Sequence, residues 1–72
     1  MASSVEQLLA AVESARTRML EALERYLPAA ERFMVDPNAF EDWRVAKNTL
    51  DAATREFQNA RDAHWDAATK AR

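Results

Sequence analysis

The sequence predicts an all-α fold, an antiparallel helical hairpin of two long helices, and three observations lead to it. The chain of 72 residues has no glycine and two prolines, and it is rich in alanine, glutamate, arginine and leucine. This composition is typical of long helices. Apolar residues recur at intervals of three and four on both sides of residues 35–38, which is coiled-coil-like spacing. The two apolar rows also match each other when the chain is folded back at that stretch.

The first helix is expected over about residues 4–34. A capping box at its start is formed either by Ser3 with Glu6 or by Ser4 with Gln7. Its apolar row is Val5, Leu8, Val12, Ala15, Met19, Ala22, Tyr26, Ala29 and Phe33. From Val12 onward a bulky residue alternates with alanine along this row.

Pro28 interrupts the first helix. It cannot donate a backbone hydrogen bond, and its ring crowds the preceding turn, so we expect a kink there. The spacing of the apolar row continues unchanged beyond Pro28. One helix kinked at Pro28 is therefore predicted, rather than two separate helices.

The second helix is expected over about residues 37–71. Asp36 can cap its start, and Pro37 suits the first turn, where the missing amide would be unpaired anyway. Its apolar row is Ala39, Trp43, Ala46, Leu50, Ala53, Phe57, Ala60, His64, Ala67 and Ala71. Bulky residues and alanines alternate along most of this row as well.

Folding the chain back at Asp36 sets the two rows against each other in layers. Facing positions of an antiparallel hairpin have a constant sum of residue numbers, here 72. The pairs are Phe33–Ala39, Ala29–Trp43, Tyr26–Ala46, Ala22–Leu50, Met19–Ala53, Ala15–Phe57, Val12–Ala60, Leu8–His64 and Val5–Ala67. Every pair except Leu8–His64 sets a larger side chain against an alanine, which is the interdigitation that a dense core needs. Residues 1–72 are therefore predicted to form a single hairpin domain, which we expect to assemble into a four-helix bundle.

The composition also argues against several classes of function. Without cysteine the chain has no disulfide and no thiolate zinc site, and its single histidine, His64, has no second ligand at metal-binding spacing. We therefore expect no metal site, no cofactor and no catalytic residue, and we predict that the chain is not an enzyme. The formal charge of −2 does not favour nucleic acid or an anionic membrane as a partner. No signal peptide or membrane span is recognisable, so a cytoplasmic location is expected.

A row of arginines on the first helix could suggest phosphate contacts. The row is Arg18, Arg25 and Arg32, and the acidic residues interleaved with it are Glu21, Glu24 and Glu31. Acids at these spacings can form ion pairs with the arginines along the helix. A solvated, salt-bridged face is therefore expected here.

Some apolar side chains are left over once the hairpin has closed. Leu20, Leu23, Leu27, Ala30 and Met34 form a second row on the first helix, here called the leucine stripe, and Phe40 lies just across the turn. Trp43 is predicted to be in the core, whereas Trp65 lies off the row and is predicted to be exposed. Exposed apolar patches of this size usually mark an interface. The predicted partner-binding residues are Leu20, Leu23, Leu27, Met34, Phe40 and Trp65.

The leftover surface favours a non-enzymatic protein–protein interaction module, which either forms a homodimer or docks on a partner protein. The hairpin with an alanine-rich row also resembles the plasmid copy-number regulator Rop, and this resemblance implies a nucleic-acid-binding hairpin dimer. That role needs a basic face, and acids interrupt every basic row of this chain. Binding to nucleic acid is therefore the alternative and is not expected.

A second resemblance concerns the turn and the second helix. Asp36, Phe40, Trp43, Leu50 and Ala53 look like the corresponding part of small type III secretion needle subunits and their hairpin co-chaperones. The resemblance covers a minor part of the chain, and the polar run from Arg61 departs from the apolar ends of those proteins. It implies a hairpin that binds protein partners, which is a second alternative.

Overall fold

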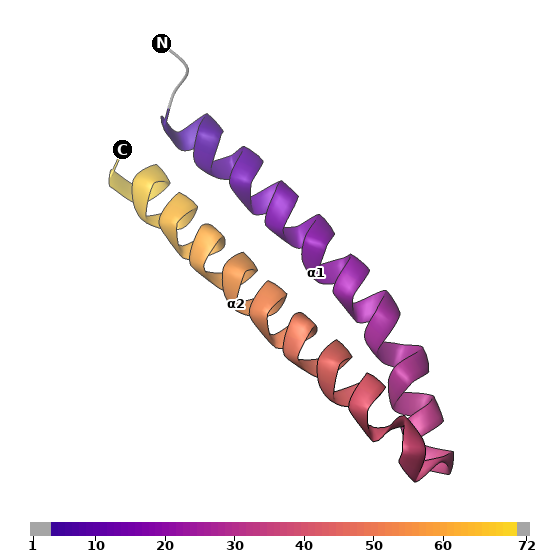
Figure 1. Cartoon of the computed structure of the whole chain (residues 1–72). Coiled ribbons are helices and arrows are strands. Elements are labelled where there is room, and N and C mark those ends of the chain that lie inside the picture. The colour runs from indigo at the N-terminus through magenta and orange to yellow at the C-terminus, as the bar shows by residue number, and fades with distance from the viewer. Residues whose placement is uncertain (1–3, 71–72) are drawn as a thin grey trace.

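In a computed structural model of the chain, two long helices run antiparallel and side by side (Figure 1). The structure describes residues 4–70, in which α1 spans Ser4–Val35, the 3₁₀ helix η1 spans Pro37–Ala39 and α2 spans Phe40–Lys70. No strand occurs in this part of the chain. The rod measures 53 × 16 × 13 Å, and the start of α1 lies at the same end as the end of α2. The predicted all-α helical hairpin is confirmed.

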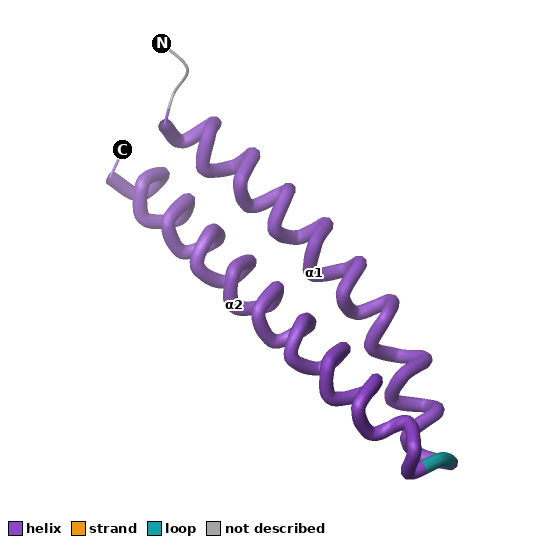
Figure 2. The backbone as a smooth tube through the Cα atoms, in the orientation of Figure 1, coloured by secondary structure: helices purple, strands orange, loops and turns teal. Residues whose placement is uncertain are grey.

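The first helix matches its predicted bounds closely. α1 continues through Pro28 and ends at Val35, so one helix is formed rather than two (Figure 2). Pro28 is exposed to solvent, and the backbone carbonyl that it leaves without a helical partner can therefore be hydrated. The capping box predicted from Ser3 involves a residue outside the described part of the chain.

The turn is built around Asp36. Its backbone is extended, with φ −140° and ψ 106°, and its carboxylate accepts a hydrogen bond of 2.9 Å from the backbone N–H of Asn38. The N–H of Asp36 donates to the carbonyl oxygen of Arg32 at 2.8 Å, and the N–H of Ala39 donates to the carbonyl oxygen of Asp36 at 3.0 Å. Asp36 therefore ends α1 and caps the following element, as predicted.

The start of the second helix requires a correction. A helix from about residue 37 was expected, but Pro37–Ala39 form a single 3₁₀ turn, and the α-helix begins at Phe40. Pro37 has no N–H, and the N–H of Asn38 is already bound to the Asp36 side chain. The turn is therefore closed by the tighter i→i+3 bonds that are common at the start of helices. At the other end, Ala71 of the predicted row lies outside the described residues.

Alanines rather than bulky residues form the buried core between the helices. The buried hydrophobic residues are Ala15, Ala22, Ala29, Ala39 and Ala53, and all of them belong to the two predicted rows. Bulky members of the rows, such as Met19, Leu50 and Phe57, are only half-buried. Small residues let two helices approach closely, but they bury little surface. Within residues 4–70, the hairpin therefore leaves every large apolar side chain at least partly accessible.

Candidate interaction surfaces

An aromatic cluster joins the two helices next to the turn. The rings of Phe33 and Trp43 stack with their centroids 5.1 Å apart and their planes at 29°. Phe40 contacts both rings, at 5.4 Å from Phe33 and 5.8 Å from Trp43. Trp43 is half-buried here. Phe40, one of the predicted partner-binding residues, takes part in this cluster and remains 45% exposed.

The leucine stripe lies uncovered on α1, as the row of leftover residues predicted. The exposed fraction is 37% at Leu23, 52% at Leu27 and 83% at Met34. Leu20 is also exposed, and Ala30 is half-buried. Met34, the most exposed member, lies at the turn end, where the stripe comes close in sequence to the aromatic cluster.

Trp65 does not belong to the same patch. It is 71% exposed, in agreement with its predicted exposure. It lies 25 residues after Phe40 on the same helix, which corresponds to about 38 Å along the axis. The six predicted partner-binding residues are therefore not brought together, and the candidate site comprises the stripe and Phe40.

Other exposed apolar residues were not singled out from the sequence. Leu9 lies two heptads before Leu23, so it continues the stripe row toward the open end, and that spacing could have revealed it. Val35 follows Met34 at the end of α1 and is equally exposed. Val45 lies on α2, where nothing in the sequence pattern distinguishes it from a surface valine.

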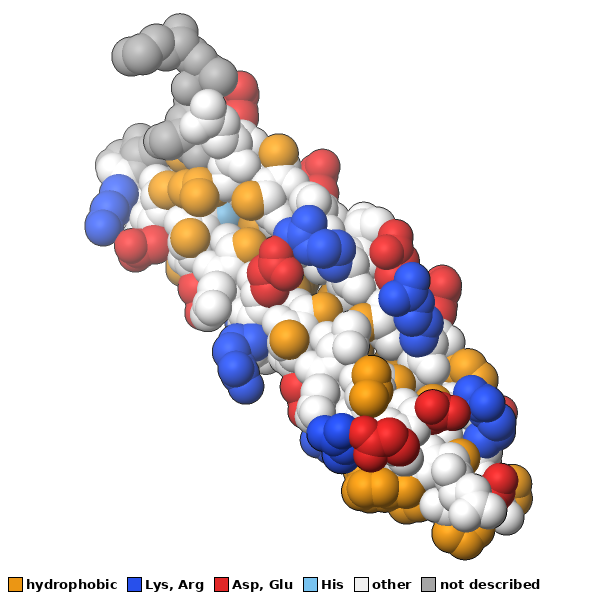
Figure 3. Space-filling model, in the orientation of Figure 1, with side chains coloured by type: hydrophobic (Ala, Val, Ile, Leu, Met, Phe, Trp, Pro, Cys, Tyr) orange, Lys and Arg blue, Asp and Glu red, His pale blue; other side chains and the backbone are white. Residues whose placement is uncertain are grey.

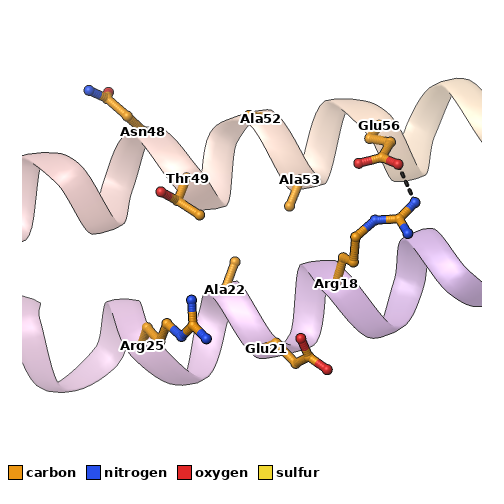
Figure 4. A pocket seen from close by; sticks show the side chains of 9 residues that line it. All are labelled: Arg18, Glu21, Ala22, Arg25, Asn48, Thr49, Ala52, Ala53 and Glu56. Carbon is orange, nitrogen blue, oxygen red and sulfur yellow. Dashed lines mark hydrogen bonds and ion pairs between the residues drawn. The ribbon is translucent and has the colours of Figure 1, made fainter.

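A groove between the helices was also missed. Two cavities of about 580 Å³ and 300 Å³ share the lining residues Ala22, Arg25 and Thr49, so together they form one open groove, here called the alanine groove. Its buried alanines are Ala22, Ala29 and Ala53, and the half-buried Ala46 completes the floor. In Figure 4, Ala22 of α1 points toward α2, while Thr49 and Ala53 of α2 point toward α1.

The arginine row forms one wall of this groove, and its predicted ion pairs require a correction. Arg18 does not pair along α1 but reaches across to Glu56 of α2, as the dashed line in Figure 4 shows. It also donates a hydrogen bond of 3.0 Å to Ser14. Arg25 and Arg32 make no ion pair with any described residue.

The three interleaved acids are unpaired as well. Within residues 4–70, Glu21, Glu24 and Glu31 form no ion pair. Exposed pairs along a helix contribute only about 0.2–0.5 kcal/mol, so little stability is lost when they do not form. The face of the molecule drawn in Figure 3 carries basic and acidic groups along its whole length, with hydrophobic side chains toward the turn and also toward the open end.

The basic residues near the turn on α2 are paired locally. Arg44 binds Glu41 one turn before it, and Lys47 lies 3.0 Å from the carboxylate of Asp51. The hydrogen bond from Arg44 holds the pKa of the Glu41 carboxyl below its ordinary value. Arg44 and Lys47 therefore each have an acidic partner within α2, whereas Arg25 and Arg32 have none among the described residues.

Sites for other chemistry are not apparent in the described part of the chain. His64 is half-buried on its row, as is Leu8, its predicted neighbour across the hairpin. No three acidic or histidine side chains among residues 4–70 are grouped so that they could hold a metal ion. Neither α1 nor α2 is apolar enough along its length to cross a membrane.

Comparisons of the chain with known proteins provide no assignment. No protein-family model, no curated protein and no solved structure matches it. A function must therefore be argued from the leucine stripe, the alanine groove and the charges beside them.

Proposed function

We propose that this hairpin is a non-enzymatic protein–protein interaction module that docks through the leucine stripe, onto a second copy or onto a partner protein. The observation that carries the proposal is the exposure of Leu20, Leu23, Leu27 and Met34 on one helix. Their shared face forms a continuous apolar surface beside a hairpin whose own core is alanine. Monomeric proteins rarely leave such surfaces open, and those that do usually bind something there.

The energetics support the same proposal. A domain of this size is only marginally stable without disulfides, a metal or association, and its buried hydrophobic residues are all alanines. Covering one exposed leucine completely contributes up to about 1.5–3 kcal/mol. Burial of the stripe would thus contribute a free energy comparable to the free energy of unfolding of the isolated hairpin. Association would therefore be coupled to folding.

The half-buried residues next to the stripe point to a helical partner. Met19, Tyr26 and Phe33 precede Leu20, Leu27 and Met34 by one residue each, so they border the stripe on α1. A helix laid on the stripe would cover these side chains together with it, as in helix-in-groove recognition. If the partner is a second hairpin, the product is a four-helix bundle.

Sedimentation equilibrium on wild type and Leu27→Glu tests the proposal. A carboxylate at the centre of the contact should abolish association, because burying it without a partner is strongly unfavourable. Thr69→Glu, which adds the same charge at an exposed position near the end of α2, is the matched control and should leave association unchanged.

Circular dichroism verifies that both variants remain helical. If wild type is monomeric at every concentration, capture of partners from the source cell is compared between wild type and Leu27→Glu. Equal behaviour of the two proteins in both experiments would contradict the proposal.

A further inference from the structure

We infer that the leucine stripe of one hairpin binds in the alanine groove of a second copy, so that hairpins associate head to tail. The inference rests on the proposed function, because it names the occupant of the same stripe. It follows from a comparison of the two surfaces that the closed hairpin leaves exposed, the leucine stripe and the alanine groove. They complement each other in position, in length, in shape and in charge.

The two surfaces lie on opposite sides of α1. The arginines of the groove wall, Arg18, Arg25 and Arg32, each precede a residue of the stripe row by two positions. Two positions correspond to about 200° around an α-helix. One hairpin therefore cannot bring its own stripe into its own groove, but each hairpin can receive a neighbour on one side and dock on another neighbour with the opposite side.

The stripe and the groove also have the same length. The groove extends along α1 from Arg18 to Arg32, and the stripe extends from Leu20 to Met34. In each case the first and last residues are fourteen positions apart, or about 21 Å along the helix. The groove has an alanine floor and a volume that is open to solvent, and the stripe offers bulky side chains on a convex helix. The contact would set large side chains against alanines, which is the arrangement that the two apolar rows predict for the hairpin itself.

The charges that lack partners match across this contact. Glu24 and Glu31 border the stripe one heptad apart, and Arg25 and Arg32 line the groove one heptad apart. None of the four makes an ion pair within the described residues. Both separations are about 10.5 Å along the helix axis. When two copies of α1 lie parallel, both acids of one copy can meet both arginines of the other.

Apart from the arginines, three acidic residues line the groove, namely Asp42 and Glu56 from α2 and Glu21, which lies on the arginine wall three residues after Arg18 and four before Arg25. Glu56 is held by Arg18 at one end. Asp42 lies on the α2 wall at the other end, across the groove from the arginine wall. The α2 wall is otherwise formed by uncharged residues, among them Val45 and Thr49, which suit the apolar stripe.

A symmetric contact between two stripes is less favourable. An antiparallel pair of α1 helices centred on Leu27 would set Glu24 of each copy close to Glu31 of the other, since the two residue numbers sum to nearly twice 27. Like charges placed in this way oppose association. Such a dimer would also leave Arg25, Arg32 and the alanine groove without a role. Head-to-tail contact uses both surfaces and continues into rings or longer assemblies.

Two variants that each block one surface test the inference. Leu27→Glu blocks the stripe and keeps the groove, whereas the double variant Arg25→Glu/Arg32→Glu blocks the groove and keeps the stripe. Each protein alone should be monomeric in sedimentation velocity. A 1:1 mixture should form a discrete heterodimer, because one intact stripe then meets one intact groove. Wild type should show species larger than a dimer as its concentration rises.

The charge contribution is tested separately. Arg25→Gln/Arg32→Gln removes the attraction without adding repulsion, so association should weaken on the order of tenfold rather than disappear. The combined variant Glu24→Arg/Glu31→Arg/Arg25→Glu/Arg32→Glu exchanges the two charge pairs and should associate again. Circular dichroism of every variant confirms that the helices are intact.

The outcomes separate the inference from the proposed function. If Leu27→Glu associates as wild type does, the stripe is not an interface, and both fail. If Leu27→Glu is monomeric while Arg25→Glu/Arg32→Glu still dimerises alone, the stripe is an interface but the head-to-tail contact is overturned. A mixture that stays monomeric, or a wild type that is monomeric at every concentration, also overturns the head-to-tail contact.

Discussion

The two ends of the hairpin are held together in different ways. Near the turn, three aromatic rings from both helices contact one another at 5.1–5.8 Å, and Asp36 fixes the chain reversal. Toward the open end, no ring contact occurs within the described residues, and the most deeply buried residue is Ala15, at 1% exposure. One end thus has a cluster of large aromatic side chains, whereas at the other the most deeply buried side chain is a single methyl group.

This difference shows that one sequence pattern can produce two kinds of packing. Both ends have apolar rows with the same spacing of three and four residues. Near the turn, the rings of Phe33 and Trp43 contact each other and Phe40. Toward the open end, the bulky residues Leu8 and Val12 are aliphatic and half-buried, and the buried side chain is that of Ala15, whose small size allows a close helix approach. The turn end should therefore be sensitive to loss of volume, and the open half to added volume.

The largest effect is expected from Trp43→Ala. It removes the ring that contacts both Phe33 and Phe40, and because Trp43 is only half-buried we expect a loss of about 2–3 kcal/mol, below the range for a fully buried tryptophan. His64→Ala, three heptads later in the same row, is the control near the open end and should cost under about 1 kcal/mol. Urea denaturation measures both. Equal losses would mean that the two ends are not packed differently.

The second prediction concerns added volume. Ala15→Leu should cost about 1–3 kcal/mol, because the alanine is almost completely buried and a larger side chain there would push the helices apart. Ala10→Leu, at an exposed position five residues earlier on α1, is the control and should change little. Thermal melts at equal protein concentration compare them. A neutral Ala15→Leu would show that the open half is not held by close alanine packing.

The hairpin itself could be predicted because it depends on backbone periodicity. Helical spacing determines which residues share a face, and it placed Ala15, Ala22, Ala29, Ala39 and Ala53 at the contact, where all five are buried. The Asp36 cap follows in the same way from local chemistry that involves only the next few residues. The exposed stripe could also be predicted, because one hairpin contact covers only one face of a helix and leaves the second apolar row of α1 exposed.

The parts that were missed depend on where long side chains reach. Layer pairing set Phe33 against Ala39 and Trp43 against Ala29, but it describes Cβ positions, and the two rings stack with each other across layers. Arg18 likewise had several acids within reach, and only the assembled hairpin shows that it binds Glu56. The alanine groove was missed for the same reason. Arg18, Arg25 and Arg32 line one of its walls, and helical spacing does not determine where such long side chains lie.

The third prediction concerns the cap at the turn end. Asp36→Ala removes the acceptor of the Asn38 N–H, and we expect a loss of about 1 kcal/mol, which is typical for a lost helix cap. Asp36→Asn and Asp36→Ser keep a side-chain acceptor and should restore most of the stability. Chemical denaturation of the three variants provides the comparison. If all three are equally unstable, the carboxylate acts through its charge rather than through the hydrogen bond.

The smallest effect is expected from the ion pair between Glu41 and Arg44, at the start of α2 beside the aromatic cluster. The hydrogen bond from Arg44 lowers the pKa of Glu41 in the folded hairpin below its ordinary value of 4.5. A depressed folded pKa means that the unfolded chain binds the proton more readily, so this contribution to stability is present above pH 4.5. It is lost as the pH falls through the lowered value.

Thermal melts between neutral pH and about pH 3 test this contribution, which should decline over the acidic part of that range. Glu41→Gln should destabilise the hairpin slightly near neutral pH and not at the acidic end, so its stability should depend less on pH than that of wild type. Arg44→Gln removes the donor instead of the carboxylate and should flatten the pH dependence in the same way. If Glu41→Gln instead follows wild type in parallel at every pH, the ion pair does not contribute to the stability of the turn end, which would then depend on the aromatic rings and the Asp36 cap alone.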